Sequence, residues 1–183
     1  MSRAVLFGCL GAIVSLWALG ASQTRAQSSP PPLHFERLEG LSHNTVLSVL
    51  QDRRGFLWIG TADGLNRYDG YEIETYRHDP RDSTSLSDNT IRPLAEGPDG
   101  TLWIGTPNGL NRYDPATGHV ARVPVSRDPQ PRLPDIQALL VDRAGNVWFT
   151  ILDAEGLYRY HPDVDSTVHY RAERSSSYGL VAD

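Results

Sequence analysis

Residues 44–70 read NTVLSVLQDRRGFLWIGTADGLNRYDG, and this pattern returns twice further along the chain. Residues 89–115 read NTIRPLAEGPDGTLWIGTPNGLNRYDP, and residues 134–162 read PDIQALLVDRAGNVWFTILDAEGLYRYHP. One tryptophan recurs every 45 residues, as Trp58, Trp103 and Trp148. Self-similarity at a fixed period of this length is typical of repeated supersecondary units. The sequence therefore predicts an array of three repeats.

Each copy predicts four antiparallel strands. An apolar run opens the copy, and turns that contain glycine, which tolerates positive φ, separate the strands that follow. In the first copy we expect strands at 46–50, 57–59, 65–68 and 71–76. The opening strands of the other copies are expected at 91–94 and 136–141, buried on both faces. Four such strands in each copy predict an all-β chain, an incomplete β-propeller ring of about three blades.

The N-terminus has the features of an export signal. Arg3 precedes an uncharged apolar stretch at 4–21, and Thr24-Arg25-Ala26 follows with the small-spacer-small pattern that a signal peptidase cleaves. We expect a signal peptide over 1–26, with Ala21 as the second choice of cleavage site. The alternative is an uncleaved membrane anchor, because the apolar stretch is at the short limit for spanning a bilayer.

The rest of the chain divides by composition and repeat. We expect a Pro- and Ser-rich spacer at 27–33, an opening strand within 34–43, and blades at 44–88, 89–133 and 134–179. The spacing of Tyr170 and Leu180 matches that of Tyr76 and Leu86, which precede the second blade. Residues 180–183 are therefore expected to begin a truncated fourth blade, leaving exposed apolar surface on both end blades.

Composition excludes several classes of function. Cys9 lies in the predicted signal peptide and is the one cysteine in the chain, so thiol catalysis, a disulfide framework and Cys-ligated zinc are not expected. Residues 27–183 carry seven more acidic than basic side chains, which argues against nucleic acid as a partner. The His spacing predicts no metal site, and no nucleotide-binding motif predicts a cofactor.

The repeats resemble the two-component regulator propeller family, whose motif is D-x-x-G-x-[LIV]-W-[IV]-G-T followed by G-L-x-R-[YF]-D. The first copy matches at 52–61 and 64–69. The second has Gly97 in place of the first Asp, and the third has Thr150 for the Gly and His161 for the last Asp. The resemblance covers about residues 35–162, most of the chain that follows the predicted signal peptide.

The resemblance implies the periplasmic sensor region of a hybrid two-component histidine kinase, of which this chain is an N-terminal fragment. In that family the strand at 35–38 closes the ring as the outer strand of the last blade. A membrane helix and a histidine kinase or other output domain follow the blades, and the parent is anchored in the inner membrane. The implied ligand is a small extracellular molecule, often an oligosaccharide, and this chain itself is not expected to be an enzyme.

Candidate residues fall into two groups. Residues at fixed places in the repeat are expected to form the structural core: Trp58, Trp103, Trp148, Tyr68, Tyr113 and Tyr160. Residues at the end of the blades where β-propellers bind ligands are candidates for ligand binding. Asp63, Asn108, Asp153 and Glu155 lie where the copies vary, and Asn44 and Asn89 open the inner strands at the same end. For the two residues Asn44 and Asn89, capping of the strand start is the alternative.

Two alternative functions stay open. A sialidase-like or lyase-like propeller enzyme would need a carboxylate pair or a tyrosine nucleophile on unique loops, and the repeats supply neither. The other alternative is a stand-alone scaffold that oligomerises through its blades.

We predict that the mature protein begins at Gln27, because cleavage after Ala26 removes the whole apolar stretch. Mass spectrometry of the exported protein checks this. Recovery of intact Met1 to Ala26 in the membrane fraction would support the anchor instead.

Overall fold

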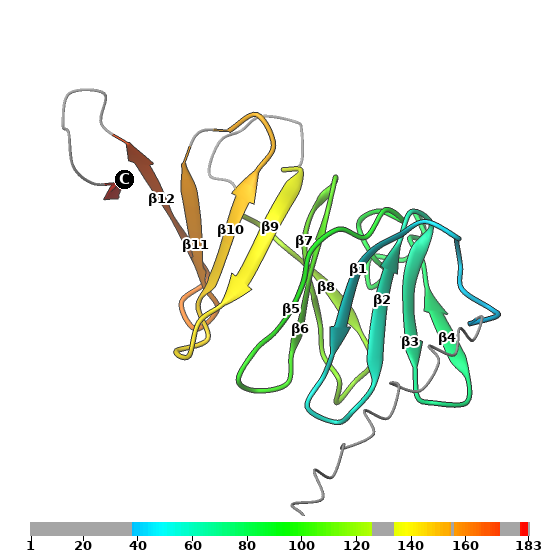
Figure 1. Cartoon of the computed structure of the whole chain (residues 1–183). Coiled ribbons are helices and arrows are strands. Elements are labelled where there is room, and N and C mark those ends of the chain that lie inside the picture. The colour runs from blue at the N-terminus through cyan, green and yellow to red at the C-terminus, as the bar shows by residue number, and fades with distance from the viewer. Residues whose placement is uncertain (1–37, 126–133, 155, 173–179, 183) are drawn as a thin grey trace, which may run out of the picture. The chain divides into compact units, whose positions relative to one another are not determined.

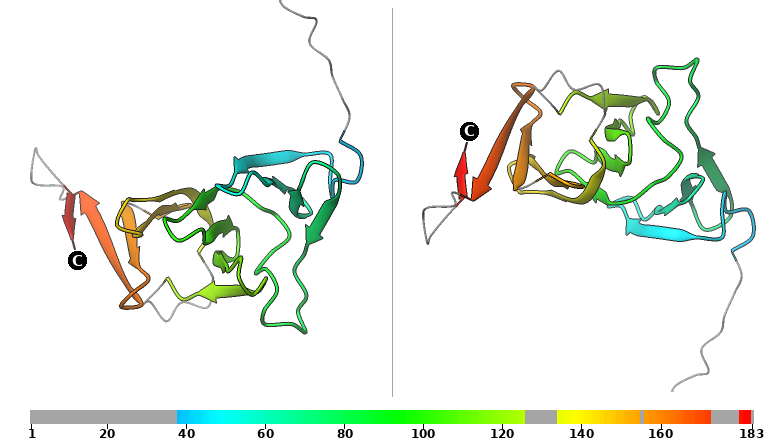
Figure 2. Two further views of the ribbon diagram at one scale, coloured as in Figure 1. Left: turned by 90° about the horizontal axis from the view of Figure 1, so that it is seen from below. Right: turned by 90° about the horizontal axis from the view of Figure 1, so that it is seen from above.

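The computed structural model describes residues 38–125, 134–154, 156–172 and 180–182, and every regular element in these ranges is a strand. The strands form three antiparallel sheets that follow one another along the chain without closing into a ring (Figure 1, Figure 2). The predicted propeller-blade architecture is confirmed. Within the described ranges, no helix is long and apolar enough to cross a membrane.

The three sheets share one order of strands. The first contains β1 (Val46–Gln51), β2 (Leu57–Thr61), β3 (Gly64–Tyr68) and β4 (Ile73–Tyr76). The second contains β5 (Leu94–Glu96), β6 (Leu102–Thr106), β7 (Gly109–Tyr113) and β8 (Val120–Val123). The third contains β9 (Ile136–Val141), β10 (Val147–Ile151), β11 (Leu157–His161), β12 (Ser166–Ala172) and β13 (Leu180–Ala182).

The opening strand of the second sheet differs from its prediction. It was expected at 91–94, but β5 spans Leu94–Glu96, because Pro93 has no N–H group to donate to a ladder. The backbone N–H groups of the two residues before Pro93 donate hydrogen bonds to two different sheets instead. The Ile91 N–H donates to the Thr61 carbonyl of the first sheet, and the Arg92 N–H donates to the Gly105 carbonyl of its own sheet. The departure from a regular strand therefore links the first sheet to the second.

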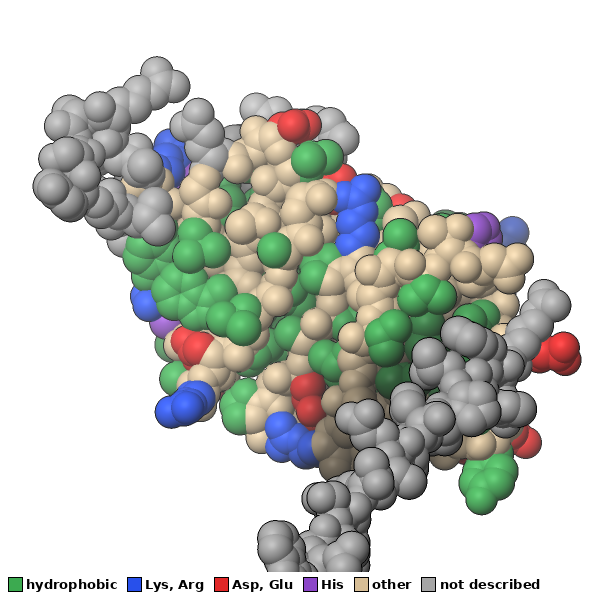
Figure 3. Space-filling view, viewed as in Figure 1, with side chains coloured by type: hydrophobic (Ala, Val, Ile, Leu, Met, Phe, Trp, Pro, Cys, Tyr) green, Lys and Arg blue, Asp and Glu red, His purple; other side chains and the backbone are tan. Residues whose placement is uncertain are grey.

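The opening strands of the first and third sheets are not buried on both faces, which corrects the prediction for both. Leu140 of β9 is 61% exposed. Val46, Leu47 and Val49 are exposed on β1. Figure 3 shows hydrophobic side chains at the surface over β1 and β2. The reason is tertiary, since in the described ranges a neighbouring sheet covers only one side of the first sheet.

Residues 180–182 take a place different from the one the spacing indicated. They were expected to begin a fourth blade, but in the structure Leu180–Ala182 forms β13 and pairs antiparallel with β12. An edge strand presents a row of unpaired backbone N–H and C=O groups, and these favour the addition of another strand. The third sheet therefore gains a fifth strand.

A carboxylate holds the first hairpin of the repeat. Asp52 Oδ1 accepts the backbone N–H groups of Arg54 at 2.9 Å and Phe56 at 3.0 Å. Its Oδ2 accepts the indole Nε1–H of Trp58 at 2.9 Å. The tight turn and the orientation of the tryptophan are thus fixed by one side chain.

The third sheet repeats this arrangement. Asp142 Oδ2 accepts the Nε1–H of Trp148 at 2.9 Å. Hydrogen bonds from the Trp148 and Asn146 side chains and from nearby backbone N–H groups lower the pKa of Asp142 to about 2. In the second sheet Gly97 stands at the equivalent place, and Asp99 accepts the Thr101 hydroxyl at 2.7 Å instead.

The core lies between the sheets, and an aromatic pair recurs there. Trp58 of the first sheet meets Tyr113 of the second edge-to-face, with ring centroids 5.0 Å apart. Trp103 of the second sheet meets Tyr160 of the third in the same way at 5.8 Å. Trp58 and Trp103 are 1% and 3% exposed. Trp148 is only partly buried and stacks on Tyr170 of its own sheet.

We predict that Trp103→Ala lowers the free energy of unfolding by about 3–5 kcal/mol, since it empties a large buried aromatic site. Trp148→Ala is the matched control, and we expect a smaller loss because no following sheet covers that ring. Urea unfolding of both variants measures the difference. Equal losses would show that the inter-sheet contact does not stabilise the fold.

Candidate ligand-binding face

We use the term loop end for the end of the sheets at which β1 begins and the β2–β3 hairpin turns. Register brings Val46 opposite Thr61, and Thr61 opposite Gly64. The last residue of β4, Tyr76, pairs with Leu65 nearby, so the loop that leads to the second sheet starts at the same end. Five of the six predicted ligand-binding positions, Asn44, Asp63, Asn89, Asn108 and Asp153, belong to segments at this end of their sheets.

A polar triad, of which Thr61 and Asn66 are buried and Ser42 is partly buried, fixes the loop end of the first sheet. The side chain of Asn66 donates to Ser42 Oγ at 2.8 Å, and its Oδ1 accepts the Ser42 backbone N–H at 2.9 Å. The hydroxyls of Ser42 and Thr61 lie 2.8 Å apart. Thr61 also donates to the Gly64 carbonyl at 2.9 Å, within the turn itself. The segment that leads into the sheet is therefore bonded to the β2–β3 hairpin.

The second sheet repeats the triad with Ser87, Thr106 and Asn111. Asn111 donates to Ser87 Oγ at 2.8 Å, and the Ser87 and Thr106 hydroxyls lie 2.8 Å apart. All three residues are buried, so each bond replaces a water contact that the group has lost. At the equivalent places the third sheet has Ile151 and Tyr158, and its loop end is built differently.

Two of the predicted ligand-binding residues meet at the loop end. Asn89, which leads into the second sheet, donates from Nδ2 to Asp63 Oδ1 in the β2–β3 turn of the first sheet at 3.1 Å. The backbone strengthens the link, since the Gly64 N–H donates to the Asn89 carbonyl at 2.7 Å. Asn89 Oδ1 accepts the His78 backbone N–H at 2.8 Å. The structure thus brings together residues that are 26 positions apart in the sequence.

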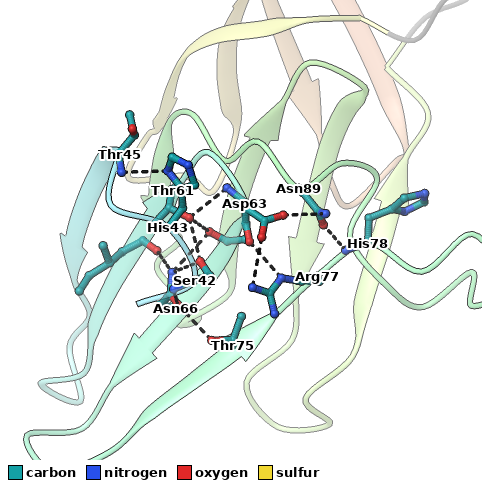
Figure 4. Close-up of polar contacts among 12 residues, drawn as sticks. Ser42, His43, Thr45, Thr61, Asp63, Asn66, Thr75, Arg77, His78 and Asn89 are labelled. Atoms are coloured by element: carbon teal, nitrogen blue, oxygen red, sulfur yellow. Dashed lines mark hydrogen bonds and ion pairs between the residues drawn. The ribbon is translucent and has the colours of Figure 1, made fainter. Parts of the chain in front are cut away.

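A cation completes the cluster of Asp63, Asn89 and Arg77 (Figure 4). Arg77 Nη2 donates to Asp63 Oδ2 at 3.2 Å, and Arg77 Nε donates to the Asp63 carbonyl at 3.1 Å. The side chains of Arg77 and Asp63 are 49% and 44% exposed, so solvent reaches both. A carboxylate, an amide and a guanidinium group held in fixed positions can donate to and accept from the hydroxyl groups of a ligand.

A second polar link joins the second sheet to the third at the loop end. Arg92 Nη1 donates to Asp135 Oδ1 at 2.7 Å, and Gln137 Nε2 donates to the same oxygen at 2.8 Å. Asn108 is exposed and donates to Asp88 Oδ2 at 2.8 Å. Polar cross-links therefore run from the first sheet to the third along one end.

The other predicted residues stand apart. Asn44 is exposed just before β1, and Asp153 is exposed in the β10–β11 turn with a φ of 60°. Among the described residues, no hydrogen bond joins either of them to another predicted ligand-binding residue. Glu155 lies outside the described residues.

Sequence reasoning missed several residues of this end. The triads carried a signal, because Ser42, Thr61 and Asn66 each recur 45 residues later. Arg92 also carried a signal in the sequence, since it interrupts the otherwise apolar run at 91–94. Arg77 lies in the loop after β4, and only the folded chain brings it to Asp63.

A hollow of about 340 Å³ lies at the opposite end of the first sheet. Arg67, Asp69, Glu72, Ile73 and Glu74 line it. Glu74 already pairs with Arg67 at 2.7 Å, and the lining is mainly charged, unlike the apolar lining of most small-molecule pockets. Within the described residues, no group of three or more His, Cys, Asp or Glu side chains could hold a metal ion.

Comparisons with known proteins point to one family. The model of the family described as two component regulator propeller matches residues 40–63 and 85–108. Histidine kinase P4 from Formosa agariphila is 48% identical over 52 residues, which is 28% of this chain and 4% of that protein. The chain thus spans a small part of this relative.

Solved structures agree on the fold. The extracellular domain of a putative hybrid two component system from B. thetaiotaomicron is 28% identical, with a TM-score of 0.65 over 74% of this chain and 20% of that one. Virginiamycin B lyase from Staphylococcus aureus is 16% identical, with a TM-score of 0.53 over 70% of this chain and 41% of the lyase. The lyase shares the fold alone.

We predict that Asn111→Ala lowers the free energy of unfolding by about 1–3 kcal/mol, because it removes the bonds that Asn111 makes with the buried Ser87 hydroxyl and backbone N–H. Asn66→Ala should cost less, since Ser42 is only partly buried and water can replace the lost bond. Thermal melting of the two variants compares them. A larger loss for Asn66→Ala would contradict the role that we assign to burial.

Proposed function

Because this chain carries repeats of the two-component regulator propeller family, we propose that it is the ligand-sensing propeller region of an extracytoplasmic two-component sensor. The observation that carries the proposal is the Asp63–Arg77–Asn89 cluster at the loop end. Its three side chains are polar, reached by solvent and fixed by bonds that join two sheets. Such an arrangement suits recognition, which needs polar groups held in position before the ligand arrives.

The ligand that we propose is a small, hydroxyl-rich molecule such as an oligosaccharide. Carboxylate and amide oxygens accept hydrogen bonds from hydroxyl groups, and guanidinium and amide N–H groups donate to them. Asn44, Asn108 and Asp153 lie exposed on the same end of their sheets and would widen this surface. The proposal also covers Glu155, which follows Asp153 by two positions in the sequence.

Two observations support the proposed extracytoplasmic location. The N-terminal sequence has the pattern of a signal peptide, and the B. thetaiotaomicron relative is an extracellular domain. Further blades, a membrane helix and an output domain are the partners that we propose in the parent protein. The net negative charge of the chain argues against a nucleic acid partner.

We propose a binding role for this chain, and no catalytic one. The alternative, a lyase-like propeller enzyme, rests on shared fold with virginiamycin B lyase. Asp63 accepts hydrogen bonds from both Arg77 and Asn89, which hold its carboxylate in a fixed position as an acceptor for a ligand.

Calorimetric titration of the protein with a panel of oligosaccharides tests the ligand class. For a sugar that binds, we expect Asp63→Ala and Asn89→Ala each to raise Kd about tenfold, because each removes about 1.4 kcal/mol of hydrogen bonding. The control is Glu72→Ala, which removes a carboxylate at the opposite end and should leave Kd unchanged. A Kd that responds to Glu72→Ala and not to Asp63→Ala would move the site to the charged hollow.

A further inference from the structure

The contact between the second and third sheets carries the same three chemical groups as the contact between the first and second. The earlier contact has the Asp63–Arg77–Asn89 cluster, with a carboxylate, a guanidinium group and an amide. The later contact has the carboxylate of Asp135, the guanidinium group of Arg92 and the amide of Gln137. We call these three residues the second cluster. Both clusters lie at the loop end.

Repetition of the fold does not account for the second cluster. The strand register puts Pro124 at the place of Arg77, and the 45-residue period puts Pro134 at the place of Asn89. Neither proline has a polar side chain, so the first cluster cannot recur between the second and third sheets. The same chemistry is instead built there from residues at other places in the repeat. Packing of the sheets alone does not require this.

The second cluster is held in place and still has atoms that can bind a ligand. Asp135 Oδ1 accepts from Arg92 and Gln137, and the Leu152 N–H donates to the Asp135 carbonyl at 2.8 Å. Among the described residues, no hydrogen bond engages Asp135 Oδ2 or Arg92 Nη2, and neither atom is buried. Gln137 is exposed. A recessed acceptor, a donor and an exposed amide are therefore open to solvent together.

The two clusters are attached to one short segment of backbone, since Asn89 belongs to the first and Arg92 to the second. The Ile91 N–H donates to the Thr61 carbonyl, and the Arg92 N–H donates to the Gly105 carbonyl. These bonds fix the segment to two sheets. The Cα atoms of Asn89 and Arg92 are three residues apart, which is at most about 10 Å of extended chain. One oligosaccharide can therefore reach both clusters.

Hydroxyl groups suit both clusters. Each cluster pairs one carboxylate with one guanidinium group, so neither has a net charge of its own with which to select an anion or a cation. A hydroxyl group both donates and accepts, and each cluster offers an acceptor and a donor side by side. The chemistry of the second cluster thus matches the ligand class proposed for the first.

We propose that Arg92, Asp135 and Gln137 form a second sugar subsite, and that the loop end binds an oligosaccharide of at least two rings. The second subsite rests on the proposed function, since the Asp63–Arg77–Asn89 cluster supplies the first. A sugar that occupies both subsites binds more tightly than a single ring, because its second contact forms within an existing complex. The second cluster therefore sets the length of sugar that the protein prefers.

Calorimetric titration with sugars of increasing length tests the second subsite. The probes are the mono-, di- and trisaccharides of glucose, galactose, mannose and xylose, and the protein is the full 183-residue chain. In the series that binds, we expect Kd to fall about tenfold or more from the monosaccharide to the trisaccharide, since one further hydrogen bond contributes about 1.4 kcal/mol.

Variants separate the two subsites. Gln137→Ala and Asp135→Asn should each raise the Kd of the trisaccharide about tenfold and leave that of the monosaccharide, bound at the first cluster, unchanged. Asp63→Ala should weaken both. The control is Gln51→Ala, which removes the same type of side chain at the far end of β1 and should change neither Kd. Thermal melting verifies that each variant is folded.

Two results would overturn the second subsite alone. One is trisaccharide binding that Asp63→Ala weakens but Gln137→Ala and Asp135→Asn leave unchanged. The other is an equal Kd for the monosaccharide and the trisaccharide of the series that binds. In both cases the proposed sugar-sensing function stands. Absence of binding to every probe would overturn the second subsite and the proposed ligand class together.

Discussion

The contact between the tryptophan of one sheet and the tyrosine of the next is the interaction on which this structure depends. A single four-stranded sheet of this length has no interior of its own, so its apolar side chains are buried only where a second sheet covers them. Trp58 and Trp103 supply the largest rings at these contacts, and Tyr113 and Tyr160 receive them edge-to-face. The stability of each sheet is therefore coupled to that of its neighbour.

The polar network at the loop end follows from the same stacking of sheets. Once two sheets are in contact, the β2–β3 turn of one lies beside the segment that leads into the next, and Asp63 reaches Asn89. The polar triads built on Asn66 and Asn111 hold each turn against that segment. The cluster is thus rigid because it is attached to two sheets, although its side chains remain open to solvent. This combination is the physical basis of the proposed recognition surface.

The same stacking leaves apolar side chains exposed on the first and last sheets of the described chain. Leu140 and Val49 are exposed at positions whose equivalents lie in the inter-sheet cores, and the Arg159 Nε is buried with no hydrogen-bond partner among the described residues. Apolar area of this kind is a driving force for association.

The sequence by itself determined the class of fold and the places of most strands, because glycine turns and the 45-residue period are local and repeated. It also pointed to Asp63, which varies between the copies, and to Asn89, which opens the second copy at the same end of the sheets. It misplaced the opening strand of the second sheet, where Pro93 moves the ladder to Leu94–Glu96, and it did not find Arg77. Only the tertiary structure decided which apolar residues are covered. Val49 and Leu94 occupy the same place in the repeat, and their burial differs because a neighbouring sheet lies against one and not the other.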